Sequence, residues 1–135
     1  MGWYKYKIDA FISANPKNID QIKYGIYLLR GLNIGLNLPT SSMPQFQAGE
    51  PWEVVEGPQG EPGSLGGHCV YVVGYDATHV TCVTWGRRHK MSWDFFVKYC
   101  DEAYIVCDTL NKWMDTQGFN LELMREQLNK ISTLS

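Results

Sequence analysis

The apolar residues of this chain follow two different periods, one typical of helices and one typical of strands. Isoleucine or leucine recurs at positions 19, 22, 26 and 29, the spacing of one helix face, and Asn18 before them is a typical N-cap residue. We therefore predict a helix over Asn18–Arg30 that Gly31 ends. In Leu32–Leu38 the apolar residues instead occupy every second position, which predicts a half-buried strand stopped by Pro39.

A β-hairpin is predicted further along the chain. Two runs rich in valine, tyrosine and threonine, Gly66–Tyr75 and Thr78–Trp85, are separated only by Asp76 and Ala77. So short a turn pairs Tyr75 with Thr78 and places His68 opposite Trp85. The hairpin then brings His68, which follows a glycine pair, beside three consecutive residues: Thr84, Trp85 and Gly86.

The remaining apolar patterns complete a small mixed fold. They predict an edge strand over Tyr4–Ile12, a short helix over Trp93–Cys100 capped by Ser92, a strand over Ala103–Cys107 and a C-terminal helix over about 120–131. With 135 residues the chain is long enough for one buried core. We expect a single α+β domain over residues 1–135, a small antiparallel barrel-like sheet with packed helices.

Residues 39–67 contain five of the six prolines and show no sustained apolar period. We predict a long ordered loop that packs on the sheet through a few apolar side chains: Met43, Phe46, Trp52, Val54 and Val55. Because the loop runs directly into His68, it would form one wall of a cleft. The alternative is that this loop is an addition to the fold that binds no ligand.

Composition removes several classes of function. A formal charge of −2 gives no basic field for nucleic acid, and no apolar run is long enough to span a membrane. The N-terminus lacks the apolar core of a signal peptide, so we expect a cytoplasmic protein. The spacing of the four cysteines is not that of a zinc site, and we expect free, mostly buried thiols, no metal and no cofactor.

Cys69 and His89 are also chemically reactive residues, and each has a structural interpretation as well as a functional one. Cys69 follows His68 directly, but successive strand side chains point to opposite faces, so the pair should not form a nucleophile and base. His89 lies in the basic run Arg87-Arg88-His89-Lys90. We expect that run to be a solvated loop, with the binding of an acidic peptide or carboxylate as the alternative.

Two short sequence motifs resemble parts of the second half of papain-like cysteine peptidases. His68–Tyr75 resembles the strand that begins with the family's catalytic histidine, and Val83-Thr84-Trp85-Gly86 resembles the family's Asn-Ser-Trp-Gly. The resemblance covers roughly residues 15–107. It implies that His68 is a general base with Thr84 and Trp85 beside it. It also implies a cleft formed by Gly66, Gly67, Cys69, Gly86, Arg87, Arg88 and Trp52.

Two departures from that family leave the function open. No segment here resembles the helix that carries the family's nucleophilic cysteine, and Val83 stands where the family has its orienting asparagine. The chain would therefore be either the histidine-bearing half of a peptidase, completed by a nucleophile supplied from elsewhere, or a pseudoenzyme that binds a peptide or protein partner. A third alternative is an assembly or inhibitory protein of a virus or mobile element. Self-association into a homodimer is expected, since half of the parent fold would leave a surface bare.

Overall fold

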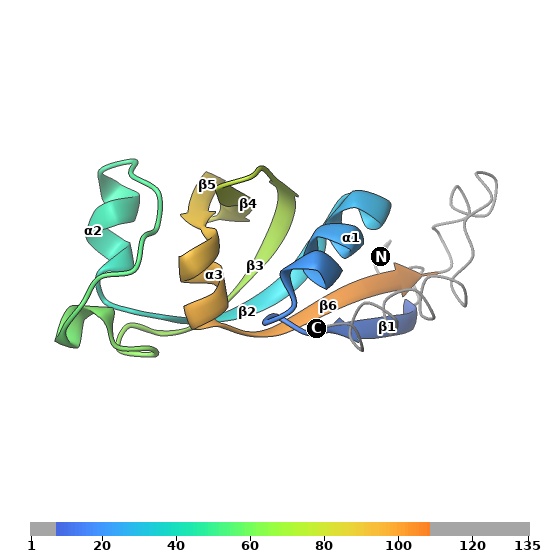
Figure 1. The fold of residues 1–135 in the computed structure, drawn as a ribbon, viewed down its shortest axis with the longest axis horizontal. Coiled ribbons are helices and arrows are strands. Elements are labelled where there is room, and N and C mark those ends of the chain that lie inside the picture. Colours follow the sequence, from blue (N-terminus) through green and yellow to red (C-terminus); the bar gives the residue numbers. More distant parts are fainter. Residues whose placement is uncertain (1–7, 109–135) are drawn as a thin grey trace, which may run out of the picture.

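The computed structural model describes residues 8–108, and these form an α+β fold around one six-stranded sheet (Figure 1). All five strand pairs are antiparallel, in the order β1-β6-β2-β3-β4-β5. The strands are β1 (Ile8–Ala14), β2 (Leu32–Leu38), β3 (Gly66–Tyr75), β4 (His79–Thr84), β5 (Arg87–Ser92) and β6 (Cys100–Asp108). The helices are α1 (Ile19–Leu29), α2 (Ser42–Gln47), α3 (Trp93–Tyr99) and a 3-10 turn, η2 (Pro58–Gly60).

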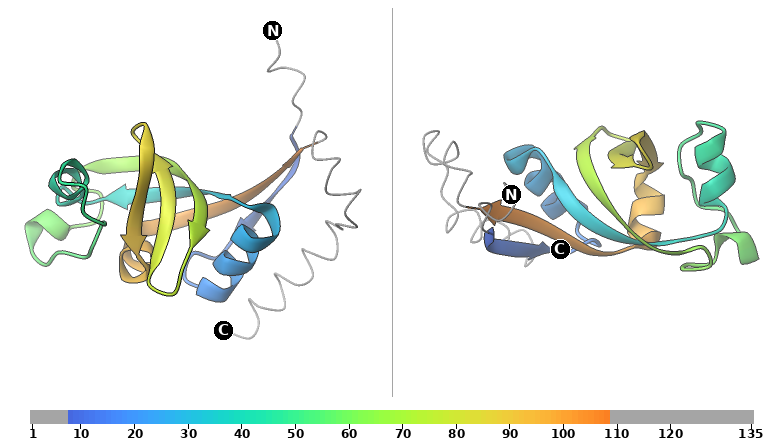
Figure 2. Two further views of the ribbon diagram at one scale, coloured as in Figure 1. Left: turned by 90° about the horizontal axis from the view of Figure 1, so that it is seen from above. Right: turned by 180° about the vertical axis from the view of Figure 1, so that it is seen from behind.

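The sheet is curled, and α1 and α3 both lie on its concave face (Figures 1 and 2). Strands β3, β4 and β5 rise over that face, while β1, β6 and β2 form its floor. Apolar side chains from both helices and from all six strands meet in one core between these layers. Its largest fully buried members are Trp52, Tyr99, Phe95, Phe96, Ile22, Leu32, Ile34, Leu36, Leu38 and Met91.

Helix α1 lies where its apolar period predicts, but the residue that ends it is not the expected one. The Asn18 side chain accepts a hydrogen bond from the Gln21 amide at 3.2 Å, as an N-cap does. Arg30, not Gly31, adopts the left-handed conformation at the C-cap, with φ of 61°. Gly31 is needed for close approach instead, because a Cβ there would lie 1.8 Å from the Tyr71 hydroxyl.

The β3–β4 hairpin is present, but the predicted register is wrong. Tyr75 pairs with Val80 rather than with Thr78, because the turn is longer than two residues. One carboxylate oxygen of Asp76 accepts hydrogen bonds from the amides of Thr78 and His79, each at 2.8 Å, and from the Thr78 hydroxyl. Such side-chain capping of the backbone stabilises a wider turn. A bulge between Val72 and Gly74 shifts the register again toward the open end.

The basic run Arg87–Lys90 is part of strand β5, which corrects the expectation of a solvated loop. Strand β5 pairs with β4 over its whole length and forms one edge of the sheet. Its alternate residues His89 and Met91 are buried in the core, whereas Arg88 and Lys90 are exposed. Four consecutive polar residues conceal this alternation in the sequence.

The long segment between β2 and β3 is ordered, as expected, and it also contains α2 and η2. Trp52 is fully buried at its centre and donates its indole N–H to the Ser42 carbonyl at 2.9 Å. Phe46 and Val54 pack against the core from the same segment. The sequence indicated these anchors but not α2, a six-residue helix that includes Pro44.

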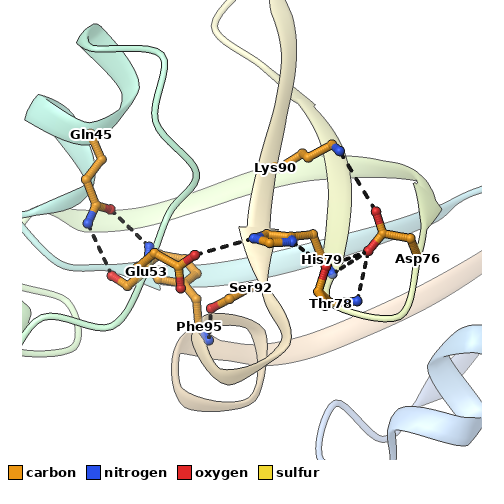
Figure 3. Close-up of polar contacts among 8 residues, drawn as sticks. All are labelled: Gln45, Glu53, Asp76, Thr78, His79, Lys90, Ser92 and Phe95. Carbon is orange, nitrogen blue, oxygen red and sulfur yellow. Dashed lines mark hydrogen bonds and ion pairs between the residues drawn. The ribbon is translucent and has the colours of Figure 1, made fainter.

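A chain of polar contacts fixes this segment to the β3–β4 turn and to β5 (Figure 3). Gln45 on α2 exchanges hydrogen bonds with the backbone of Glu53. The Glu53 carboxylate lies 3.4 Å from the imidazole of His79, whose other nitrogen contacts Thr78 in the Asp76 turn. Lys90 on β5 approaches the Asp76 carboxylate at 3.9 Å.

Two expectations lie partly or wholly outside the described residues. The first seven residues of the chain are not described, and the strand expected over Tyr4–Ile12 corresponds to β1, which continues to Ala14. The expected C-terminal helix over about 120–131 lies outside the described range. The predicted strand over Ala103–Cys107 is present as part of β6, and the predicted helix after Ser92 is present as α3.

Candidate functional site

His68 lies near the start of β3, at the open end of the hairpin. It pairs with Leu36 of β2, and the regular register from Gly66 to Val72 fixes which face of the sheet it occupies. His68 shares that face with Val70 and Val72, both buried, so its ring lies at the rim of the core. Partial burial disfavours the charged imidazolium and lowers the pKa of His68 below its ordinary 6.5.

One ring nitrogen of His68 is held by a buried hydroxyl. His68 Nε2 lies 2.7 Å from Thr84 Oγ1, and the Thr84 side chain is only 4% exposed. Val83, which the family resemblance aligned with the orienting asparagine, points outward and is 41% exposed. The residue that orients the imidazole is therefore Thr84. No hydrogen bond from the described residues reaches Nδ1 of His68.

Trp85 covers the same imidazole. The two rings are stacked with centroids 4.8 Å apart and planes inclined by 27°. Trp85 and Gly86 form the turn between β4 and β5, and both have positive φ, 44° and 82°. Positive φ at both central residues is typical of a type I′ turn, which glycine and asparagine prefer. A tryptophan in this position carries backbone strain, and its indole lies against His68.

Below Trp85 lies an aromatic cluster that joins the loop to β5. Phe46 and Trp52 each contact both Trp85 and His89, at centroid distances of 4.8 to 6.0 Å. His89 is 5% exposed, and its Nε2 has no hydrogen-bond partner among residues 8–108. Burial, and then the nearby charge of Arg87, lower the pKa of His89. Trp52, expected in the cleft, is instead a fully buried support of Trp85.

The two arginines after the turn take different positions. Arg87 lies over the Phe46 ring, with its guanidinium carbon 3.8 Å from the centroid, and donates a hydrogen bond to the Phe46 carbonyl. It therefore ties α2 to the Trp85 turn. Arg88 is opposite Val83 on the outer face of the sheet. Arg88 thus lies on the other side of the sheet from the His68 imidazole.

Cys69 is separated from His68 as the strand geometry predicts. It pairs with Gly35 in the unbroken β2–β3 ladder, so its thiol lies on the opposite face from the imidazole. Cys69 is exposed, which corrects the expectation of a packed thiol, while Cys82 and Cys100 are buried and free. Burial raises the pKa of both Cys82 and Cys100 to about 12.

The glycine pair before His68 leaves its surroundings open. A Cβ at Gly66 or Gly67 would meet no heavy atom within 4 Å, and only Gly66 has a φ, 141°, that favours glycine.

Among the described residues, no group of three or more histidine, cysteine, aspartate or glutamate side chains is placed to hold a metal ion. None of the described helices has the length and apolar character that crossing a membrane requires.

Comparison of the chain with protein-family models, with curated proteins and with solved structures finds no match. The geometry of the chain itself therefore carries the functional argument.

The structure brings together three of the residues that the sequence singled out, His68, Thr84 and Trp85, and adds Phe46 and His89 beneath them. No local sequence pattern could have placed His89 in this cluster, because the four consecutive polar residues 87–90 conceal the alternation of buried and exposed positions in β5. A half-buried imidazole that is held at one nitrogen, and whose other nitrogen has no hydrogen bond to a described residue, is suited to accept a proton from a nearby group.

Proposed function

We propose that this chain supplies the general base of a papain-like cysteine-peptidase site, with His68 as the base and with the nucleophilic cysteine carried by another segment or polypeptide. The observation that carries the proposal is the contact between His68 Nε2 and Thr84 Oγ1 under the Trp85 ring. It reproduces the division of roles that nucleophile and base sites require: a third group orients the base and leaves one nitrogen for the reaction.

In this proposal the tautomer of His68 follows from its partner. Nε2 carries the proton and donates it to Thr84 Oγ1, so the lone pair of Nδ1 is available. Burial favours the neutral ring at pH 7, which is the protonation state that a general base needs. Trp85 shields the contact from water, and the Phe46–Trp52–His89 cluster holds Trp85 in place.

The proposed reaction is an acyl transfer, first to the supplied cysteine and then to water. Nδ1 of His68 takes the thiol proton of the supplied cysteine while its sulfur attacks the scissile carbonyl. The imidazolium then gives that proton to the departing amine, and a thioester links the acyl group to the cysteine. Water, deprotonated by the same nitrogen, then attacks the thioester carbonyl; the C–S bond breaks, the acid is released and the imidazolium returns a proton to the cysteine thiolate. Neither Cys69, on the opposite face, nor the buried Cys82 is placed to serve as the nucleophile.

The test is to label the native assembly with an epoxide probe that alkylates activated cysteines. The assembly is purified through this chain from its source cells, and the modified cysteine is located by mass spectrometry. We expect the label on a cysteine outside residues 8–108, and we expect its loss when the chain carries His68→Ala. Cys69→Ser is the matched control and should leave the labelling unchanged.

The isolated chain provides a complementary measurement. It should not hydrolyse a fluorogenic peptide amide, because a general base alone supplies only ~10²–10⁴-fold acceleration. Labelling or turnover that survives His68→Ala would remove His68 from the site. Turnover that disappears with Cys69→Ser would show that the nucleophile lies in this chain after all.

A further inference from the structure

Strand β5 is an edge strand, and only half of that edge is covered by the described residues. Trp52 pairs with it as a single parallel bridge: its amide donates to the Lys90 carbonyl at 2.9 Å, and its carbonyl accepts from the Ser92 amide at 3.0 Å. The chain then leaves the edge, since the Glu50 amide donates to the Gln45 carbonyl at 2.9 Å instead. A backbone can therefore pair with this edge, and does so at one residue.

The rest of the edge carries backbone groups with the same orientation. In a strand the N–H and C=O of one residue point to the same side, and the side alternates from residue to residue. Because the Lys90 carbonyl points to the edge and the register with β4 has no shift, the amide of Lys90 and both backbone groups of Arg88 also point there. No described residue outside the sheet forms a backbone hydrogen bond with these three groups.

A basic hollow lies along this uncovered part. It has a volume of about 390 Å³ and is lined by Gly49, Pro51, Thr81, Arg88, His89 and Lys90. Arg88 and Lys90 are both exposed on the outer face of the sheet. Lys90 has a distant partner in Asp76, at 3.9 Å, while Arg88 forms no ion pair with any described residue.

We propose that the edge of β5 from Arg88 to Lys90 binds an extended acidic peptide as an added strand. Residues that face each other in neighbouring strands project to the same side of a sheet, so acidic side chains two positions apart would lie beside Arg88 and Lys90. The ligand class is thus a strand-forming segment with aspartate or glutamate at alternate positions. The Arg88 and Lys90 side chains lie on the other face of the sheet from His68.

The first test uses a synthetic peptide, acetyl-Thr-Glu-Val-Glu-Thr-amide, and follows the amide signals of Arg88 and Lys90 by NMR. We expect saturable shifts at these amides, and about tenfold weaker binding for Arg88→Ala, the change expected for one lost charge-assisted hydrogen bond. Lys98→Ala, which removes an exposed cation on α3, is the matched control and should bind normally. Glu50→Gln, which removes a negative charge between Gly49 and Pro51, should strengthen binding.

The second test separates strand pairing from simple charge attraction. The peptide is N-methylated either at its first, third and fifth residues or at its second and fourth. Only one of these two sets points its amides at β5, so one set should abolish binding and the other should leave it nearly intact. Equal effects of both sets, an equal response to a peptide with lysine in place of glutamate, or no saturable shift up to millimolar peptide would each overturn the proposal.

Discussion

At the scale of single residues, the orientation of His68 depends on the hydroxyl of Thr84, which the sequence analysis placed beside His68 without assigning it this role. The resemblance placed Val83 at the orienting position, and from the sequence that residue cannot bond an imidazole. The bulge and the longer turn shift β4 against β3, so Val83 points outward and Thr84 points to His68. A one-residue change of register exchanges the two faces of a strand, which is why the sequence placed Thr84 near His68 without showing that its hydroxyl contacts the ring.

Replacing Thr84 tests that contact directly. Thr84→Val keeps the shape of the side chain and removes the hydroxyl, so it should lower the free energy of unfolding by about 1 kcal/mol. It should also abolish the preference of the imidazole for the proton on Nε2. Urea unfolding gives the first quantity and ¹⁵N NMR of the ring gives the second. A tautomer ratio equal to that of the wild type would show that Thr84 does not orient His68.

His89 should make the fold sensitive to acid. Its pKa is lowered in the folded protein, mainly by burial, so the unfolded chain binds a proton near pH 6.5 that the folded chain does not. Stability is then greatest above pH 6.5 and falls as the pH decreases from 6.5 toward the lowered value.

Substitution of His89 isolates this contribution. His89→Phe keeps an aromatic ring and removes the titration, and it should reduce the slope of stability against pH by up to about 1.4 kcal/mol per pH unit. Urea unfolding at pH 7.5, 6 and 5 gives both slopes. His68 and Asp76, whose pKa values are also lowered, would contribute to the slope that remains. An unchanged slope in the variant would mean that His89 is not kept neutral by the fold.

At the scale of elements, the sequence predicted those whose apolar period is long or whose caps are distinctive. Helix α1 with Asn18, strand β2 before Pro39, and helix α3 after Ser92 all lie where the pattern placed them. The misses have physical reasons. Strand β5 begins with four polar residues because it is an edge, and α2 is too short for a period to show.

The candidate site was predictable only in part for the same reason. Its hairpin residues follow from local patterns, since His68, Thr84 and Trp85 belong to neighbouring strands. Phe46 and Trp52 reach the site from the long segment between β2 and β3, whose path depends on tertiary contacts such as the Trp52 bridge to β5. No local propensity encodes those contacts.

The path of that segment can be tested at η2. A Cβ at Gly60 would lie 1.6 Å from the Val55 carbonyl oxygen, a backbone atom that no side-chain rotation can move. Gly60→Ala should therefore lower the free energy of unfolding by about 1–3 kcal/mol. Gly74→Ala is the control, because a Cβ there meets nothing within 4 Å. Equal urea-unfolding midpoints for the two variants would mean that the close approach at Gly60 is absent.

At the scale of the whole molecule, the helices cover one face of the sheet and the described residues leave the opposite face uncovered (Figures 1 and 2). Tyr71 and Val83 pair across β3 and β4 there and are 43% and 41% exposed. This is the surface on which a second body, or a second copy, would pack if the expected association occurs. That association stays a prediction.

The cysteines report on the integrity of the fold as a whole. Iodoacetamide should modify the exposed Cys69 in the native protein, whereas Cys82 and Cys100 should react only through unfolding. The difference in rate should be at least about a thousandfold, given the small unfolded fraction of a stable domain. Quenched time points analysed by peptide mass spectrometry measure each site separately. Comparable rates at all three positions would show that the core opens without global unfolding.

The open edge of β5 also bears on aggregation. Unpaired edges of sheets are sites where identical molecules add to one another and grow into fibrils, and proteins commonly prevent this with charged residues along the strand. An antiparallel pairing of two β5 edges would bring the Arg88 and Lys90 side chains of one molecule close to those of the other, and like charges that face each other repel. The same two cations that would attract an acidic strand thus disfavour the pairing of two β5 edges. Neutralising both Arg88 and Lys90 should therefore cause the protein to aggregate while it is still folded.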